Sequence, residues 1–263
     1  MKSSDTVFRD ISLFLILFMI VGLSGCVKED RKDCPCSLVL DFSEVDTVVV
    51  SSVDLTVLSD SDFAYTEAVE KERFRNYSIY VPRTQLQLLL WAGAGHCLNA
   101  DKSVAIPLGE ECPRIYMHHS VIAASGEQLS EKVVLRKNHC VITIQFADGY
   151  GEMFDLTVTG KVCGYGKDCN PSVGEYACKV VPDSSGRCVV TVPHQLDSSL
   201  CLEIEDETES LKVFPIGQYI AESGYDWNSP DLDDISMTLD YSLTDVCLEI
   251  CDWDNDQRYD IVI

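Results

Sequence analysis

Cys26 is the residue for which the sequence specifies a chemical role most clearly. It follows Leu23-Ser24-Gly25, where two small residues let the backbone enter the groove of a peptidase. Cleavage before Cys26 would leave a thiol that can accept a diacylglyceryl group, and buried acyl carbons contribute roughly 0.8 kcal/mol per methylene. Several acyl chains on one cysteine would therefore hold the chain at a bilayer. The alternative is an ordinary secreted protein with a chance cysteine beside its cleavage site.

Residues 1–25 have the layout of a signal peptide that ends in a bacterial lipobox. An apolar run from Ile11 to Leu23 is interrupted only by Ser12 and Gly22, and Lys2 and Arg9 precede it. At about 13 residues the run is too short for a hydrocarbon core of ~30 Å, which needs roughly 20. We therefore expect a signal peptide over residues 1–25 and an exported chain that begins at residue 26.

The composition excludes one class of partner. Lysine and arginine number 20 against 43 aspartates and glutamates, which gives a formal net charge of −23 at pH 7. Phosphate backbones are bound by clustered lysine and arginine, so no nucleic acid is expected as a partner. Strong negative charge keeps an exported protein soluble, and this accounts for the acidic composition without a specific cationic ligand.

The cysteine content is high, since 13 cysteines occur in 263 residues and an even twelve remain when Cys26 is set aside for lipid. Export permits disulfides. No Cys-x-x-Cys pair occurs, so a zinc ribbon or a thioredoxin-like redox pair finds no support, and no metal site is predicted. Structural disulfides and buried free thiols both stay open. A cystine could close the glycine-rich loop between Cys163 and Cys169.

The histidines form no recognisable catalytic or metal-binding pattern. None of the five stands in a His-Glu-x-x-His arrangement, and neither a Gly-x-Ser-x-Gly elbow nor a phosphate-binding Gly-x-x-x-x-Gly-Lys loop is present. His118 and His119 would point to opposite faces of a strand, which argues against shared metal ligation. We predict that the chain is not an enzyme and needs no cofactor.

The acidic segment from Asp252 to Asp256 places oxygen atoms at alternate positions, as the start of a calcium loop does. It lacks the glycine that should follow, because Gln257 stands there, and the closing glutamate would fall at Ile263. A polar hairpin turn between strands over residues 247–250 and 259–263 explains the segment better.

The elements that must position these residues are short runs of β-branched or aliphatic residues with period two, separated by polar residues, glycine or proline. We predict strands over residues 37–42, 47–58, 85–91, 133–135, 140–146, 154–162, 188–192, 200–204 and 211–216. No long segment with a period of 3.6 occurs, so helices should be few and short. An all-β chain with this many strands predicts sandwiches, in which two sheets bury their inner faces against each other.

The length of the chain predicts two such sandwiches, because one small sandwich uses about 100 residues. A tether would occupy residues 26–33, an N-terminal sandwich residues 34–132 and a C-terminal sandwich residues 133–263. The polar stretch from Glu127 to Lys137 is the expected crossing between them. The last strand, which includes Asp260 to Ile263, either closes its own sheet or lends its edge to another chain.

Three stretches of the sequence carry a family resemblance. In the first, from Cys26 to Cys36, a charged segment and Asp33-Cys34-Pro35 lead into the first strand. The second is Leu89-Leu90-Trp91-Ala92-Gly93. The third comprises Gly217 to Ala221, Tyr225-Asp226-Trp227, Leu232-Asp233-Asp234 and Asp252 to Ile261. Together these stretches resemble the FimB/Mfa2 family of Bacteroidales fimbrial lipoproteins, from which the cysteine-rich second half of the chain departs.

The resemblance implies two tandem transthyretin-like β-sandwich domains and the role of a fimbrial anchor. Cys26 would carry the lipid that holds the outer membrane, and a fimbrial shaft subunit, docked through an edge strand, would be the protein partner. Lys28-Glu29-Asp30 looks like the signal that sends lipoproteins of these bacteria to the outer face of that membrane, although a solvated tether is the other interpretation. Shaft subunits of related fimbriae lose an N-terminal segment to an arginine-directed protease. A cut at Arg31 or Lys32 here would free the chain without opening a sheet, which favours an anchor.

Two other roles are open from the sequence. A surface lipoprotein that binds a glycan or host ligand could use Tyr225, Trp227 and Trp253 as aromatic contacts. Exposed and coplanar aromatic rings would favour that role, whereas buried tryptophans would count against it. An acidic hydrolase is the third role, for which the sequence places no nucleophile or ligand set.

Overall fold

The computed structural model describes residues 34–60, 62–146, 155–205 and 211–239, and the backbone of residues 246–251 and 256–261. The described residues are mostly β-structure, as predicted, and their strands form four sheets. The helical segments of the described residues are short: η2 (Lys71–Asn76), η3 (Gly95–Cys97) and α2 (Ile216–Glu222). Within the same residues, no helix is long and apolar enough to cross a membrane.

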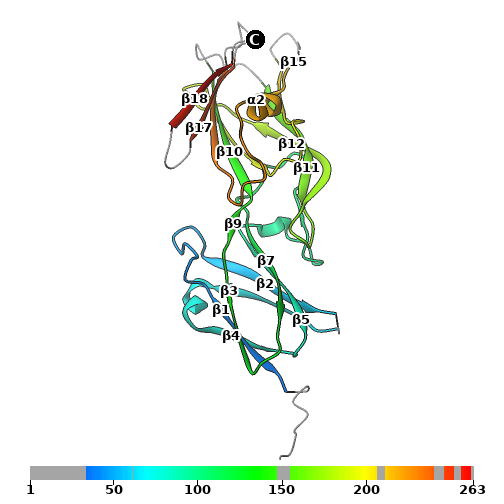
Figure 1. The fold of residues 1–263 in the computed structure, drawn as a ribbon. Helices are drawn as coiled ribbons and strands as arrows, with labels where there is room; N and C mark the ends of the chain where they lie inside the picture. The colour runs from blue at the N-terminus through cyan, green and yellow to red at the C-terminus, as the bar shows by residue number, and fades with distance from the viewer. Residues whose placement is uncertain are drawn as a thin grey trace, which may run out of the picture.

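The first pair of sheets forms the lower lobe in Figure 1. Its three-stranded sheet has the order β4 (Tyr77–Val81), β1 (Cys36–Asp41), β8 (Gln128–Lys132). Its five-stranded sheet has the order β3 (Ala64–Glu70), β2 (Ser52–Ser59), β5 (Gln85–Ala92), β7 (Tyr116–Ala123), β9 (Arg136–Lys137). The two sheets enclose one apolar cluster, to which alternate residues of β1 and β2 contribute.

The second pair of sheets forms the upper lobe (Figure 1). One sheet has the order β13 (Arg187–Pro193), β10 (His139–Phe146), β16 (Asp234–Leu239), β17 (Val246–Cys251), β18 (Asp256–Ile261). The other has the order β12 (Pro171–Val180), β11 (Asp155–Tyr165), β14 (Cys201–Glu205), β15 (Leu211–Phe214), with β6 (Val104–Ala105) paired to β11. A second apolar cluster fills the space between them.

The two sheet pairs repeat one strand order. β1 pairs antiparallel with β4 and parallel with β8, and β10 pairs antiparallel with β13 and parallel with β16. The facing sheets correspond as well, β3-β2-β5-β7 to β12-β11-β14-β15. The second pair adds the hairpin β17–β18 beside β16, whereas in the described chain no strand lies beside the outer edge of β8. The structure therefore repeats a unit that is not visible as a repeat in the sequence.

β5 contributes to both apolar clusters. Leu88 and Leu90 belong to the first cluster, and Leu89 and Trp91 belong to the second. Successive side chains of a strand point to opposite faces, so a strand that is buried on both faces reads as a continuous apolar run. This explains why the end of β5 lacks the alternation seen in β1.

The connection between β5 and β7, residues 93–115, fastens the second sheet pair to the first. Its strand β6 pairs with the end of β11, and the indole N–H of Trp91 donates to the carbonyl of Lys102 at 3.2 Å. The Tyr165 hydroxyl of β11 donates to the carbonyl of Asn138 and accepts from the backbone N–H of His194 at 3.0 Å. Hydrogen bonds and apolar packing thus join the two lobes at this connection.

The expected crossing between the two sandwiches at residues 127–137 is wrong for most of this segment. Gln128–Lys132 form β8, which lies along β1 within the first sheet pair. The strand predicted over residues 133–135 is wrong, since the next strand is β9 (Arg136–Lys137), paired with β7. The crossing follows immediately, because β10 begins at His139. Division into two transthyretin-like domains stays a prediction.

The hairpin predicted near residues 247–263 is confirmed. β17 and β18 pair antiparallel over six residues each, so the last described strand lies in a sheet of its own chain. The candidate calcium-loop residues Asp252 to Asn255 lie outside the described residues.

Candidate functional site

The predicted lipidation site and export signal, Cys26 and Lys28-Glu29-Asp30, lie outside the described residues and stay predictions. Cys34 is the first described residue and lies two residues before β1. β1 is the central strand of its sheet, with five residues paired to β4 and five paired to β8. A chain that enters from residues 26–33 therefore continues directly into a strand that is hydrogen-bonded on both sides.

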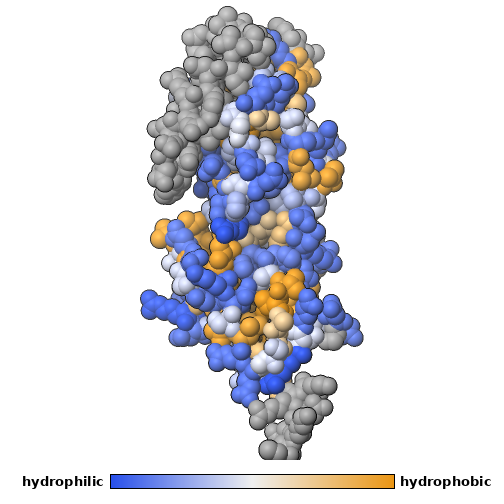
Figure 2. Space-filling view, in the orientation of Figure 1, coloured by the Kyte–Doolittle hydropathy of each residue, from blue (hydrophilic) through white to orange (hydrophobic). Residues whose placement is uncertain are grey.

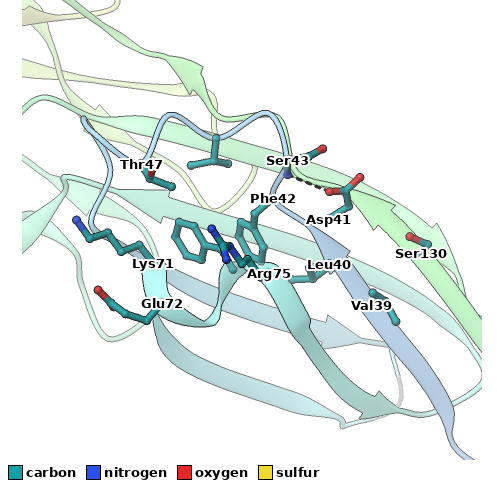
Figure 3. A pocket seen from close by; sticks show the side chains of 12 residues that line it. Val39, Leu40, Asp41, Phe42, Ser43, Thr47, Lys71, Glu72, Arg75 and Ser130 are labelled. Atoms are coloured by element: carbon teal, nitrogen blue, oxygen red, sulfur yellow. Dashed lines mark hydrogen bonds between the residues drawn. The ribbon is translucent and has the colours of Figure 1, made fainter.

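A cavity of about 1160 Å³ opens beside the end of β1 (Figure 3). Its apolar part includes the rings of Phe42 and Phe74, which stack with centroids 4.4 Å apart and an interplanar angle of 9°. Charged side chains also line it, Asp41 from β1 and three from η2, namely Lys71, Glu72 and Arg75. This combination of apolar and charged groups suits a peptide segment or a polar ligand.

One carboxylate of the cavity, that of Asp41, is held by its neighbour Ser43. The backbone N–H of Ser43 donates to the carboxylate of Asp41 at 2.9 Å, and this hydrogen bond lowers the pKa of Asp41. The twelve lining residues include neither histidine nor cysteine. The lining therefore offers apolar and charged contacts to a ligand, but no thiol and no imidazole.

A network around Glu67 of β3 holds η2 in place beside the cavity. The carboxylate of Glu67 pairs with the guanidinium of Arg73 and accepts from the hydroxyls of Tyr65 and Tyr77, each at 2.6 Å. Arg73 also lies over the ring of Tyr77, 5.1 Å from its centroid. Arg73 and the two hydroxyls lower the pKa of Glu67 to about 2, so the carboxylate stays charged at neutral pH.

The cystine that the sequence suggested between Cys163 and Cys169 is not present in the structure. All ten cysteines of the described chain are free thiols, so for these ten the structure has buried or partly buried thiols rather than disulfides, apart from the exposed Cys34. Cys163 and Cys169 in particular are not joined across the β11–β12 turn. Burial raises the pKa of Cys140 and of Cys169 to about 12, so both thiols stay protonated at neutral pH.

Three of the histidines lie on β7 and β10, where their rings make contacts within the fold. His118 and His119 lie on β7, where His118 contacts the backbone of Val134 and His119 the side-chain amide of Gln87, as expected for opposite faces. His139 is 1% exposed, and its Nδ1–H donates to the carbonyl of Ile115 at 3.0 Å. Burial lowers the pKa of His139 to about 4, which keeps its imidazole neutral.

Sequence reasoning missed one cluster of chemically capable side chains. His96, Cys97 and Glu110 lie together in the connection between β5 and β7. The only signal in the sequence is the adjacent His96-Cys97 pair, which matches no spaced ligand motif. The turn of η3 and the return of the chain at residue 110 bring the three side chains together.

The aromatic contacts proposed for a glycan-binding surface are not arranged as a platform. Tyr225 and Trp227 are half-buried against the second apolar cluster, and their rings meet edge to face at 4.8 Å and 66°. The Tyr225 hydroxyl donates to the carbonyl of Asp233 at 2.8 Å. Sugar stacking needs an open ring face, which this T-shaped pair does not offer as a coplanar surface. Trp253 lies outside the described residues.

Comparison with known proteins shows a shared fold. No family model and no curated protein sequence matches the chain. A Bacteroides thetaiotaomicron structure, provisionally described as a polysaccharide-binding protein, has a TM-score of 0.64 and 14% identity over 86% of this chain and 98% of its own. A Bacteroides ovatus structure, provisionally described as an adhesin, has a TM-score of 0.58 and 11% identity over 89% and 99%.

The fimbrial anchor protein Mfa2 from Porphyromonas gingivalis has a TM-score of 0.61 and 11% identity, over 78% of this chain and 91% of its own. At such low sequence identities the similarity concerns the fold alone. Because it covers 78% of this chain, it includes both sheet pairs. The chain therefore has the fold of the Bacteroidales fimbrial anchor Mfa2, which confirms, for the fold, the predicted resemblance to the FimB/Mfa2 family.

Proposed function

We propose that this chain is a lipid-anchored subunit of the outer membrane that anchors the base of a fimbrium and helps set its assembly and length. The observation that carries the proposal is the fold shared with the fimbrial anchor Mfa2 over 78% of this chain. The lipobox that ends in Cys26 supplies the membrane attachment that an anchor needs. Two tandem transthyretin-like sandwiches complete the proposed architecture.

The proposed attachment uses the segment before β1. Cys26 carries the lipid, Lys28-Glu29-Asp30 directs the lipoprotein to the outer face of the membrane, and residues 26–33 form the tether. A pull on this tether acts along β1, whose hydrogen bonds to β4 and β8 run roughly across the direction of the pull. Those bonds share the load, so the central position of β1 suits a subunit that is held under tension.

The proposed protein partner is a shaft subunit of the fimbrium, docked through an edge strand. An edge presents a row of unpaired backbone N–H and C=O groups that can pair with another chain. The outer edge of β8 is such an edge in the described chain, and the hairpin β17–β18 covers the corresponding edge of β16. The difference between the two sheet pairs supports β8 as the docking edge.

The proposal includes no enzyme activity and no cofactor. Support comes from the similar structures, which are described as an anchor, an adhesin and a binding protein.

Deletion of the gene in its host tests the anchoring role. We expect electron microscopy to show fimbriae shed into the medium or of abnormal length, because the base of the fimbrium would lose its attachment. The wild-type gene should restore attachment. Fimbriae that remain attached and of normal length without the gene would refute the anchor.

The Cys26→Ala variant tests the lipid attachment separately. We expect it to leave the outer-membrane fraction, because the acyl acceptor is gone. Cys34→Ala is the matched control, since Cys34 is an exposed free thiol eight positions further along the chain. A Cys26→Ala protein that still fractionates with the outer membrane would contradict lipidation.

The cavity favours a second candidate, a surface lipoprotein that binds a glycan or a host ligand. Its volume of about 1160 Å³ is large enough for an oligosaccharide or a peptide segment. Arg75→Ala should weaken any such binding in a glycan or peptide array, because it removes a cation from the lining. Arrays without a specific ligand would remove this candidate and leave the anchor unaffected.

A further inference from the structure

We propose that His96, Cys97 and Glu110 form a binding site for a zinc-like divalent transition-metal ion. Nε2 of His96 lies 2.6 Å from Oε2 of Glu110 and 3.8 Å from Sγ of Cys97. The three ligand atoms all lie within 4.8 Å of one another. The site lies in the connection between β5 and β7, away from the cavity beside β1 and from the proposed lipid attachment.

The distances fit a tetrahedral ion after a small adjustment. Bonds of about 2.0 to 2.3 Å from Zn²⁺ to nitrogen, oxygen and sulfur place neighbouring ligand atoms about 3.3 to 3.8 Å apart. The distance between His96 and Cys97 already has this value. His96 and Glu110 must separate by about 1 Å to admit the ion between them. Their side chains are 73% and 48% exposed, so both are free to move.

The donor set selects the class of metal. An imidazole nitrogen, a thiolate sulfur and a carboxylate oxygen are the donors of zinc sites, whereas calcium and magnesium prefer oxygen donors alone. The Cys97 residue is 2% exposed, so its sulfur lies below the two exposed ligands. This arrangement leaves an entry path from solvent. Three protein ligands leave the fourth position for water or an external donor.

Two other states of these side chains compete with a metal site. His96 and Glu110 already form an ion pair, but a pair between exposed groups contributes little to stability and needs no neighbouring thiol. A disulfide between Cys97 and Cys112 is the other state, because both are buried cysteines of the same connection. Metal binding and this disulfide exclude each other, since the metal needs a free Cys97 thiolate.

A bound ion would stabilise the contact between the two sheet pairs. His96 and Cys97 lie near the start of the connection and Glu110 lies near its end, with β6 between them. A metal that joins the two ends removes conformational freedom from the intervening loop. Since β6 pairs with β11, this constraint acts directly on the junction between the lobes.

Metal titration of the full, detergent-solubilised lipoprotein tests the site under reducing conditions. We expect one equivalent of Zn²⁺ to bind, and Co²⁺ to give the absorption bands of tetrahedral thiolate coordination. Glu110→Gln and His96→Gln should each weaken binding at least tenfold, and Cys97→Ser should remove the thiolate-to-cobalt band. His119→Gln and Glu175→Gln are the matched controls, since both residues are exposed and lie elsewhere, and they should bind as the wild type does.

A second measurement separates loss of metal binding from loss of folding. Circular dichroism should show that Glu110→Gln is folded, because Glu110 is an exposed loop residue. Hydrogen exchange of residues 98–109 should slow when Zn²⁺ is added to the wild type and stay unchanged in Glu110→Gln. Failure of the folded wild type to bind one equivalent, equal weakening in the control variants, or a Cys97–Cys112 disulfide in the native protein would overturn the site.

Discussion

At the scale of the residue, His139 shows how a buried polar group holds the junction between the lobes. Its Nδ1–H donates to the carbonyl of Ile115, and its ring packs edge to face against Tyr116 at 5.2 Å. Burial removes the solvent that would stabilise an imidazolium ion, so the pKa falls to about 4. The hydrogen bond to the Ile115 carbonyl and the charge of Asp234 oppose this fall in pKa, whereas the charges of Lys137 and Arg114 add to it.

The low pKa of His139 predicts acid sensitivity. The unfolded imidazole has a pKa of about 6.5, so between that value and about 4 the unfolded state binds more protons than the folded state. Stability is therefore complete above the unfolded pKa and falls as the pH is lowered through this window. His139→Asn keeps a donor near the position of Nδ1 but cannot titrate. Urea midpoints of this variant should fall less steeply with acid than those of the wild type.

His119→Asn is the control for this prediction, because His119 is an exposed histidine of β7 and should leave the acid dependence of the wild type unchanged. Equal slopes for His139→Asn and the wild type would contradict the prediction, since the acid sensitivity would then come from other groups.

At the scale of the element, strands with an apolar pattern were predictable and polar strands were not. β1 and β10 alternate apolar and polar residues, and the predicted ranges match them to within one residue at each end. β8 has Leu129 as its single apolar residue, because only one of its edges is paired and much of it faces solvent. β7 places His118, His119 and Ser120 at its centre, and these residues hide its period from sequence analysis.

The candidate sites also differ in whether the sequence alone can predict them. The lipidation of Cys26 is a prediction that the sequence alone can make, because a signal peptidase and an acyl transferase would recognise a short continuous segment. His96 and Cys97 meet Glu110 only because the chain turns back between them, and this turn depends on the docking of β6 against β11. The spacing of these residues along the sequence therefore does not predict that their side chains lie together.

Substitution of Gly93 tests how tightly the backbone is packed in the connection after β5. Gly93 has φ of +78°, and a Cβ atom there would lie 2.0 Å from the carbonyl oxygen of Arg114. The clash involves backbone on both sides, so side-chain movement cannot relieve it. We expect Gly93→Ala to lower the free energy of unfolding by more than about 2 kcal/mol, from left-handed strain and this contact. Urea denaturation measures the loss.

Gly224→Ala is the matched control for Gly93→Ala. Gly224 has φ of +84°, but nothing lies within 4 Å of its added Cβ. Left-handed strain alone should cost about 1 kcal/mol. Equal losses at the two glycines would show that the carbonyl of Arg114 moves away readily and that the connection is not tightly held.

At the scale of the whole molecule, the two lobes follow one another along an extended body whose visible face is mainly hydrophilic, with separate apolar patches (Figures 1 and 2). The exposed large apolar side chains include Val48 and Tyr80 of the first lobe and Val173 of the second. The lobes share more than a linker, because β5 carries residues of both clusters and β6 pairs across the junction. This continuity would let a pull on β1 reach the second lobe.

Shared burial predicts that the lobes unfold together. Leu55 lies only in the first cluster and is fully buried, so Leu55→Ala should cost about 2 to 5 kcal/mol. Unfolding of the first lobe also withdraws Leu89 and Trp91 from the second cluster, a loss on the order of 5 kcal/mol. We therefore expect Leu55→Ala to lower the urea midpoint of amide protection in β11 as well as in β2.

Hydrogen-exchange mass spectrometry across a urea series measures both midpoints. The control is Val121→Ala, at a 57% exposed site of β7, which should change neither midpoint. If β11 kept its wild-type midpoint while that of β2 fell, the lobes would be independent domains and tension would pass between them only through the connecting chain.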